Sequence, residues 1–301
     1  MFQVTHTPYC YPFKQPLRTA HGIWRDREGI IVTLTAADGR QGQGEIAPLP
    51  MFGTETLGEA IAYCQSLGDR RDCATLAQIP DCLPACQFGF ATAIQALENP
   101  TPLIHLSAAQ VAQLIPLNLR ALPQIQVLHQ QGATTFKCKI GVQDSAQEQG
   151  IWRQLSQQSP SDIRFRLDAN GGLTPAIAEQ WLELAQAQGN VEFIEQPLPP
   201  AQFDRMQAFS RTFSVPIALD ESVSTWADLQ QCYAAGWRGI YVVKVAIAGE
   251  PQRLIEFCQA QRLDLVCSSV FETAIGRQGA LRVAQRLQSQ RPLGFGVQSW
   301  F

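Results

Sequence analysis

The chain has 301 residues, of which 46% are hydrophobic and 16% are charged, and its formal net charge is −3. This composition is typical of a folded globular protein and excludes a disordered one. Lysine and arginine are scattered along the chain, so neither a nucleic acid nor an anionic membrane surface is indicated as a partner. We expect the partner to be a small molecule.

The N-terminal residues MFQVTHTPYC contain no basic region followed by an apolar stretch, so we expect no signal peptide. No apolar run approaches the ~18 residues of a membrane span, and even GIYVVKVAIAG is interrupted by Lys244. The nine cysteines include no CxxC pair and are expected to be reduced, mostly buried thiols. Together these features predict a soluble protein of the cytoplasm.

The first third of the chain predicts strands and helices in one α+β domain. Residues 28–47, EGIIVTLTAADGRQGQGEIA, contain two strand-like runs joined at Asp38-Gly39, a pair that favours a hairpin. Two segments with helical spacing of apolar residues follow, GTETLGEAIAYCQSL and PACQFGFATAIQALEN, and the second ends at Asn99-Pro100. We assign residues 1–108 to this domain.

From about residue 113 onward, short apolar runs alternate with amphipathic helical segments. The eight runs are LIPLNL, TTFKCKIG, IRFRLDANG, VEFIEQP, PIALDES, GIYVVKVA, LDLVCSSV and LGFGV. Such alternation indicates βα units around a parallel sheet, and eight of them suggest a closed barrel. We therefore predict an α/β fold in which residues 109–301 form a TIM-type barrel, with the C-terminal tail packing back on the first domain.

Three acidic residues, Asp168, Glu195 and Asp220, each fall at the end of an apolar run. Active sites of such barrels lie at the C-terminal ends of the strands, so these carboxylates would meet at one mouth. Each acid alone is more often the cap of the next helix, but three together repel one another unless a cation lies among them. Carboxylate oxygens without histidine or cysteine suit Mg²⁺, with Mn²⁺ as a substitute. The sequence predicts a divalent metal site.

Two lysines, Lys137 and Lys139, belong to one predicted strand, and residues two apart point to the same face. A KxK pair alone is typical of a solvated face or a rim salt bridge. At about 6–7 Å apart, the two ammonium groups repel by about 2–3 kcal/mol at an effective dielectric constant of ~20. That repulsion corresponds to about two pKa units. We predict that one of them loses its proton near neutral pH and acts as a base, with Lys244 across the mouth.

At this point the motifs resemble the enolase superfamily, specifically its muconate-lactonizing-enzyme-like subgroup. They are KCK (137–139), DAN (168–170), EQP (195–197), DES (220–222) and VVKVA (242–246). The resemblance implies a modified (β/α)7β barrel behind an N-terminal α+β capping domain. It also implies abstraction of a proton α to the carboxylate of a small molecule, giving an enediolate held on Mg²⁺.

Residue by residue, the resemblance implies a role for each polar position of the motifs. The metal ligands would be Asp168, Glu195 and Asp220. The base would be Lys139, Lys137 would be its pKa-lowering neighbour, and Lys244 would be the lysine on the opposite face.

Three further runs resemble a dehydrating branch of this superfamily: GEIAPLPMFGTET (44–56), CSSVFET (267–273) and the ending PLGFGVQSWF. The resemblance implies a syn dehydration of a hydroxycyclohexadiene carboxylate towards menaquinone or phylloquinone. Lys139 would take the α-proton and return it to the departing hydroxide, while Lys244 would stabilise the enediolate. Substrate contacts are implied at Asn170, Ser268 and Ser269, although small hydroxyls at strand ends equally satisfy backbone groups.

Two loops of the capping domain, Leu17–Trp24 and Pro48–Thr54, are expected to close the mouth and select the substrate, with Met51 and Phe52 as apolar cover. The alternative is that they are only surface loops. None of the four histidines falls at a predicted strand end, which disfavours members of the superfamily with a histidine base.

Two other functions stay open. A dipeptide epimerase or N-acylamino acid racemase would use Lys139 and Lys244 as a two-base pair, but similar epimerases carry a DxD pair near the eighth strand, where GFGVQSW has no acid. A non-catalytic barrel that binds a metal or metabolite is the second alternative, since fold alone does not determine activity. The presence of every polar position of the catalytic set disfavours it.

Overall fold

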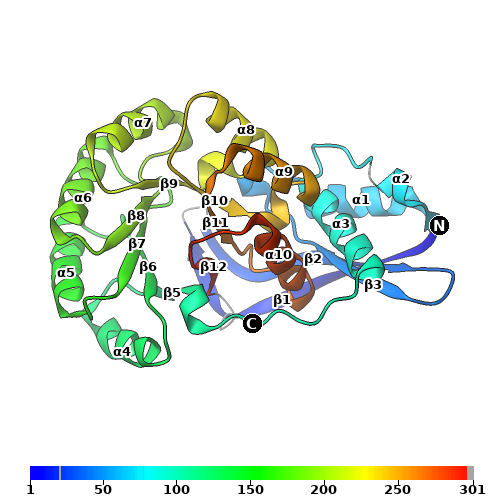
Figure 1. Ribbon diagram of the computed structural model, residues 1–301, viewed down its shortest axis with the longest axis horizontal. Helices are drawn as coiled ribbons and strands as arrows, with labels where there is room; N and C mark the ends of the chain where they lie inside the picture. The colour runs from blue at the N-terminus through cyan, green and yellow to red at the C-terminus, as the bar shows by residue number, and fades with distance from the viewer. Residues whose placement is uncertain (20–21, 77, 297–301) are drawn as a thin grey trace.

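The computed structural model describes residues 1–19, 22–76 and 78–296, and it shows two parts side by side (Figure 1). A long antiparallel sheet with helices forms the N-terminal part, and a barrel of parallel strands wrapped by helices forms the rest. This arrangement confirms the predicted α/β barrel with an N-terminal α+β domain. The division between residues 108 and 109 stays a prediction. The predicted packing of the C-terminal tail concerns residues 297–301, which lie outside the described residues.

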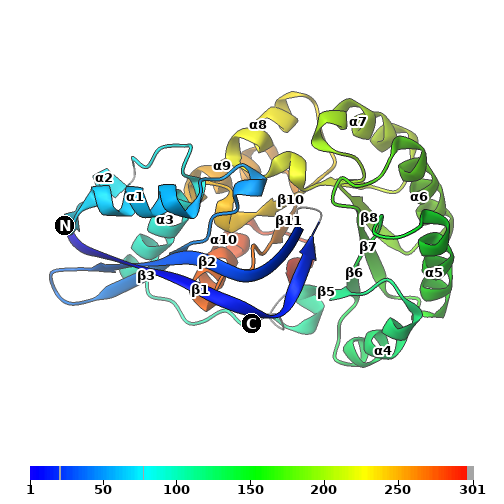
Figure 2. The same cartoon turned by 180° about the vertical axis from the view of Figure 1, so that it is seen from behind.

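The N-terminal sheet is antiparallel and has the strand order β3-β2-β1-β4. Its strands are β1 (Phe2–Thr19), β2 (Gly22–Thr35), β3 (Gln41–Ile46) and β4 (Arg70–Arg71). The predicted hairpin joins β2 to β3, with Gly39 at a φ of 86°, a left-handed value that glycine adopts without strain. Figure 2 shows that the β1–β2 hairpin extends from this sheet to the barrel.

Helices cover one face of this sheet. They are α1 (Leu57–Leu67), α2 (Cys73–Leu76) and α3 (Pro84–Glu98), while the short turn η1 (Pro50–Phe52) lies between β3 and α1 in the chain. α1 begins with a capping box, in which Thr56 and Glu59 each accept a hydrogen bond from the other's backbone N–H. α3 packs directly on β3, because a Cβ atom at Gly44 would lie only 1.9 Å from the carbonyl oxygen of Gly89.

The barrel closes in the order β10-β11-β12-β5-β6-β7-β8-β9. Its strands are β5 (Val111–Ile115), β6 (Thr135–Lys139), β7 (Arg164–Asp168), β8 (Val191–Glu195), β9 (Ile217–Leu219), β10 (Ile240–Lys244), β11 (Asp264–Ser268) and β12 (Leu293–Gly296). Strands β5 to β11 are each followed by an α-helix, and β12 is the last element described, which matches a (β/α)7β pattern.

The barrel helices lie on the outer side of the strands (Figure 1). They are α4 (Leu122–Gln130), α5 (Ser145–Gln158), α6 (Pro175–Gln188), α7 (Phe203–Thr212), α8 (Trp226–Ala234), α9 (Pro251–Gln261) and α10 (Ala274–Leu287). Short 3-10 turns join several elements: η2 (Ala108–Gln110), η3 (Leu119–Ala121), η4 (Pro200–Gln202), η5 (Glu221–Val223) and η6 (Val245–Ile247).

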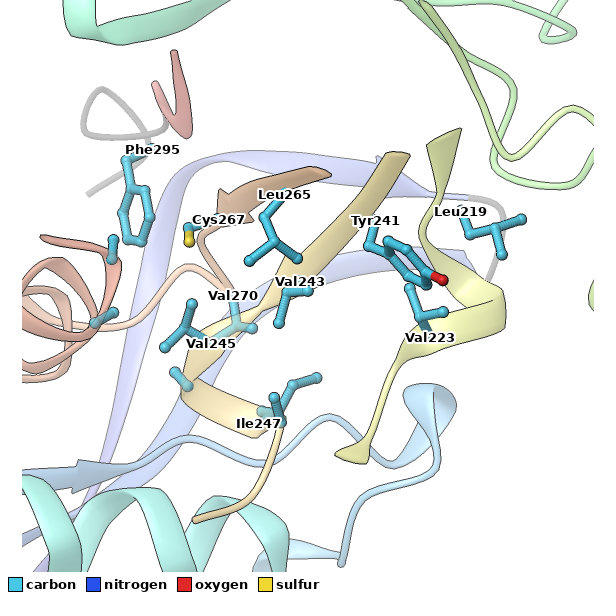
Figure 3. Packing of buried hydrophobic residues seen from close by; sticks show 14 of the residues in the cluster. Leu219, Val223, Tyr241, Val243, Val245, Ile247, Leu265, Cys267, Val270 and Phe295 are labelled. Carbon is cyan, nitrogen blue, oxygen red and sulfur yellow. The ribbon is translucent and has the colours of Figure 1, made fainter. Parts of the chain in front are cut away.

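Alternation along β10 decides which side chains fill the barrel. Ile240 and Val242 belong to the small apolar cluster that fills its interior, together with residues of β8, β9 and β11. Tyr241 and Val243 face the other way, into the larger core that continues to the helices and the N-terminal sheet (Figure 3). The same alternation places Lys244 on the interior face, at the C-terminal end of the strand.

The carboxylate of Glu45, at the end of β3, joins the N-terminal sheet to the barrel. This side chain is fully buried, and it accepts hydrogen bonds from the backbone N–H groups of Thr273 and Gly276, at 2.9 Å each, in the first turn of α10. The hydroxyl of Tyr9 donates to it at 2.5 Å, and burial together with the charge of Glu45 raises the pKa of that hydroxyl. Glu45 therefore caps a barrel helix from the other domain.

Arg27 of β2 makes a second connection of the same kind. Its buried guanidinium donates to the carbonyl oxygens of Ala47, at 2.6 Å, and of Val270, at 3.0 Å, in the segment between β11 and α10. The segment that follows β11 is thus held by buried charged groups of the N-terminal sheet.

Among the cysteines whose side chains are described, all are free thiols, and only Cys10 and Cys82 are exposed. No helix in the described part of the chain is long and apolar enough to cross a membrane. The cytoplasmic location stays a prediction.

We expect Glu45→Ala to lower the free energy of unfolding by about 2–5 kcal/mol, because it leaves several buried donors of Tyr9, Thr273 and Gly276 without an acceptor. Urea unfolding followed by circular dichroism measures this loss. Glu59→Ala is the matched control, since it removes an exposed helix cap whose loss costs only about 1 kcal/mol. Equal losses for the two variants would contradict a joining role for Glu45.

Candidate active site

The structure brings the predicted acids to one end of the barrel. Lys139 pairs in register with Asp168 on the neighbouring strand, and Asp168 pairs with Glu195 on the next one. Asp220 follows the last residue of β9 directly. All three acids are buried, at 1%, 1% and 5% exposure. Their positions follow from strand register and from the period of two along each strand.

The lysines meet at the same end. The chain contains only four lysines, and three of them, Lys137, Lys139 and Lys244, line one cavity of about 130 Å³. β6 and β10 lie four strands apart in a closed barrel of eight, so Lys139 and Lys244 stand on opposite sides of the mouth. The cavity therefore has ammonium groups on two of its walls.

Ion pairs connect these lysines to the acids. Lys137 Nζ lies 2.7 and 2.8 Å from the two carboxylate oxygens of Glu195 and 2.9 Å from Asp168 Oδ2. Lys139 Nζ lies 3.3 Å from the same Asp168 oxygen. Across the cavity, Lys244 pairs with Asp220. Every acid of the set thus has an ammonium partner.

These pairs set the protonation of the buried groups. Burial alone lowers the pKa of Lys137, but the charges of Asp168 and Glu195 outweigh it and hold that pKa above its usual value. Burial, followed by the charge of Asp168, raises the pKa of Glu195 to about 8. Burial raises the pKa of Asp168, but the charges of Lys137 and Lys139 lower it by more, so the pKa of Asp168 lies below its usual range. Lys137 is therefore a charged neighbour of Lys139 in this arrangement.

The acids fit a divalent cation by their chemistry. Within residues 1–19, 22–76 and 78–296, no three His, Cys, Asp or Glu side chains are already arranged as a set of metal ligands. Ammonium groups lie among the carboxylates: Lys137 bridges Asp168 and Glu195, and Lys244 pairs with Asp220. Three buried carboxylates that attract cations and offer only oxygen donors are what a hard divalent ion requires.

The three predicted substrate contacts also line the cavity. The carboxamide oxygen of Asn170 accepts from Lys139, and its nitrogen donates to Glu221 at 3.0 Å. Ser269 donates to Glu272 at 2.8 Å, and the hydroxyl of Ser268 lies 3.4 Å from the carbonyl oxygen of Gly294. Both serines thus have protein partners, which supports the structural alternative for their hydroxyls.

The capping loops supply the apolar wall. Leu49 and Phe52 line the cavity, and the Phe52 ring lies 4.2 Å from Lys244 Nζ, while Met51 is exposed and lines a neighbouring groove. Of the other loop, Trp24 lines the cavity. Residues 20 and 21 lie outside the described residues, and the side chains of residues 17–19, 22 and 23 are not described.

Sequence reasoning missed three residues of this region. Gln196 is fully buried, and its oxygen accepts from the backbone N–H groups of Asp220, at 3.0 Å, and Ser222, at 3.2 Å, which fixes the segment that carries Asp220. Glu221 and Phe271 line the cavity. Gln196 belongs to the EQP motif and Glu221 to the DES motif, but no pattern in the sequence indicated their contacts.

The comparisons with known proteins agree with this geometry. Two family models match the chain: "MenC, N-terminal domain" over residues 3–97 and "Enolase C-terminal domain-like" over residues 122–294. An o-succinylbenzoate synthase of Thermosynechococcus vestitus is 40% identical over 97% of this chain and 91% of that protein. One of Edwardsiella ictaluri is 31% identical over 98% of this chain and 90% of that protein.

Solved structures extend the likeness. An o-succinylbenzoate synthase from Thermosynechococcus elongatus, complexed with Mg in its active site, has a TM-score of 0.92 at 39% identity and covers 99% of this chain and 94% of that one. A dipeptide epimerase from Methylococcus capsulatus, complexed with Mg and a dipeptide, has a TM-score of 0.83 at 22% identity, over 99% of this chain and 90% of that one. The second likeness shows the fold alone.

The barrel, the capping domain and the family models together define an enzyme of the enolase superfamily, whose members use a divalent metal. Within that superfamily, the chain belongs to the o-succinylbenzoate synthase family. The predicted family is thereby confirmed.

We expect Mg²⁺ to raise the unfolding temperature, because an ion that binds only the folded state stabilises it by about 2.7 kcal/mol at a hundred times its dissociation constant. Asp220→Asn removes one carboxylate from the set and should abolish most of this increase. Differential scanning fluorimetry with Mg²⁺ and with chelator measures it. Asp204→Asn, an exposed acid on α7, is the control and should respond like the unmodified chain. An unchanged response of Asp220→Asn would exclude Asp220 as a ligand.

Proposed function

We propose that this chain dehydrates 2-succinyl-6-hydroxy-2,4-cyclohexadiene-1-carboxylate to o-succinylbenzoate, with Lys139 as the base and Mg²⁺ as the metal. Its family consists of carbon–oxygen lyases, and this chain is such an enzyme, acting on a small molecule in menaquinone-type quinone biosynthesis. The observation that carries the residue assignments is the meeting of three lysines and two of the three buried acids at one cavity, with Glu195 directly beneath Lys137.

Lys139 is the better placed of the two lysines on β6. Lys137 is held by both oxygens of Glu195 and by Asp168, so its ammonium group has no freedom to approach a substrate. Lys139 has a more exposed side chain, 32% against 21% for Lys137. Among the described residues, its contacts with charged and amide groups are those with Asp168 and Asn170. Its neutral amine takes the proton from the carbon α to the substrate carboxylate.

The same lysine completes the elimination. After proton uptake, Lys139 is an ammonium ion on the face from which the proton left. It returns that proton to the hydroxyl as the carbon–oxygen bond breaks, so that water leaves and the ring becomes aromatic. A syn elimination therefore needs one lysine on one face of the ring.

Lys244 acts by its charge from the other side of the cavity. Negative charge grows on the substrate carboxylate as the proton leaves, and a fixed ammonium group stabilises it without having to reorient. Phe52 covers Lys244 at 4.2 Å and limits its contact with water, which strengthens this interaction.

The residues that would hold the metal are Asp168, Glu195 and Asp220. When bound, Mg²⁺ supplies positive charge that stabilises the developing charge on the substrate carboxylate. Lys137, next to Lys139 on the same face of β6, would add positive charge beside the base. Mg²⁺ is favoured over softer ions because the donors are all oxygens.

One observation favours a second activity, racemisation of N-acylamino acids. Lys139 and Lys244 stand on opposite sides of the cavity, which is the arrangement that proton exchange at both faces requires. Exchange of the α-proton of an N-acylamino acid in D₂O would reveal this activity beside the dehydration.

We expect Lys139→Ala to lower turnover by about 10²–10⁴-fold or more, because it removes both the base and the acid of the elimination. Loss of diene absorbance of the purified protein with Mg²⁺, and with chelator, measures turnover. Lys14→Ala, the one lysine outside the cavity, is the matched control and should keep full activity. Near-normal activity of Lys139→Ala would remove that residue from the role, and an inactive unmodified chain would contradict the proposed function itself.

A further inference from the structure

Asn170 connects the proposed base to an acid that has no role so far. Its carboxamide oxygen accepts from Lys139 Nζ, and its nitrogen donates to Glu221 Oε1 at 3.0 Å. Its backbone N–H donates to Asp168 Oδ1 at 3.0 Å, and its φ of 45° lies in the left-handed region. The backbone contact thus fixes the position of the Asn170 Cβ atom, and the two side-chain contacts fix the orientation of the carboxamide.

Glu221 decides which end of the carboxamide faces the lysine. A carboxamide has an oxygen that accepts and an NH₂ group that donates, whereas a carboxylate only accepts. Glu221 accepts from the NH₂ end of Asn170 while Lys139 donates to its oxygen, so the two contacts together hold the carboxamide in one orientation. Without a hydrogen-bond acceptor at position 221, the Asn170 carboxamide is free to turn over. Its NH₂ group would then face Lys139 and could not accept a hydrogen bond from the lysine.

The orientation matters for a base. A neutral lysine amine has two N–H donors and one lone pair. The oxygen of Asn170 and Asp168 Oδ2, at 3.3 Å, are acceptors for N–H groups of Lys139. An amine whose N–H groups are held by acceptors on the wall directs its lone pair into the cavity, where the proton must come from.

Glu221 is distinct from its neighbour Asp220, although both follow β9. Asp220 faces Lys244, whereas Glu221 faces Asn170 on the other side. Glu221 lines both the main cavity and the adjoining groove, and its Oε2 is buried without a hydrogen-bond partner among the described residues. A half-buried acid whose buried oxygen has no partner among the described residues, at the wall of a cavity, is not explained by packing.

We propose that Glu221 is a positioning residue: it orients the carboxamide of Asn170 so that Asn170 holds Lys139 in the geometry for proton transfer. This proposal rests on the proposed function, because it takes Lys139 as the base.

Kinetics of three variants test the proposal. Glu221→Ala should lower kcat by about 10- to 100-fold while KM and the Mg²⁺ activation constant change by less than about threefold, because only the orientation of the base is lost. Glu221→Gln keeps an acceptor oxygen for Asn170 and should stay within about fivefold of the unmodified chain. The double variant Glu221→Ala with Asn170→Ala should be no slower than Asn170→Ala alone, since Glu221 acts through Asn170.

Three outcomes would overturn the proposal: unchanged kcat in Glu221→Ala, additive losses in the double variant, or a large rise in the Mg²⁺ activation constant. The last would make Glu221 a metal ligand. Circular dichroism checks that each variant is folded. If Glu221→Ala fails to fold, Glu221→Met, which has similar volume and no oxygen, takes its place in every comparison.

A measurement without turnover separates this proposal from the proposed function. Labelling with ¹⁵N-lysine gives only four side-chain signals, which the lysine variants assign. Glu221→Ala should shift the Lys139 signal, Glu221→Gln should shift it much less, and Lys14 should not move in either. An inactive unmodified chain with this pattern would contradict the reaction and support the contact. An unmoved Lys139 signal would refute the positioning role.

Discussion

The site depends on one constraint, the balance of charge around three carboxylates buried at the end of a barrel. Asp168, Glu195 and Asp220 are at most 5% exposed, and buried carboxylates without partners are strongly unfavourable. Lysines on β6 and β10 supply the partners. The charges that stabilise the barrel mouth are therefore also those available for chemistry, and the same oxygens would hold the proposed divalent ion.

The apolar wall of the cavity depends on the other domain. Phe271 follows β11 with a φ of 60°, an unusual value for a bulky residue, and its ring lies edge-on to Phe13 at 5.6 Å. The segment around it is held from the N-terminal sheet by Arg27 and Glu45. Buried polar contacts between the domains thus keep a strained segment in place at the substrate cavity.

Regular alternation made much of this predictable. Asp168 and Glu195 end apolar runs, and Lys244 continues the interior face of β10. The long strand β1 was missed because Pro8 and Pro12 disfavour strands; they are tolerated since β1 pairs with β4 only at its first residues, which leaves one edge free. The contact between Glu221 and Asn170 could not be predicted. The two residues are 51 positions apart in the sequence, and Asn170 has a left-handed backbone conformation that its sequence does not indicate.

The lysines do not by themselves decide between elimination and racemisation, because both reactions use opposite sides of one cavity. The groups that hold the substrate decide it, and β12 is informative here. A Cβ atom at Gly294 would lie 2.8 Å from the hydroxyl of Ser268, and one at Gly296 would lie 2.4 Å from the carbonyl oxygen of Ala112. Both positions are glycines with little room for a side chain, so the described part of β12 offers no carboxylate to a substrate ammonium group. This feature of β12 favours a substrate without a free amine, as in the proposed dehydration.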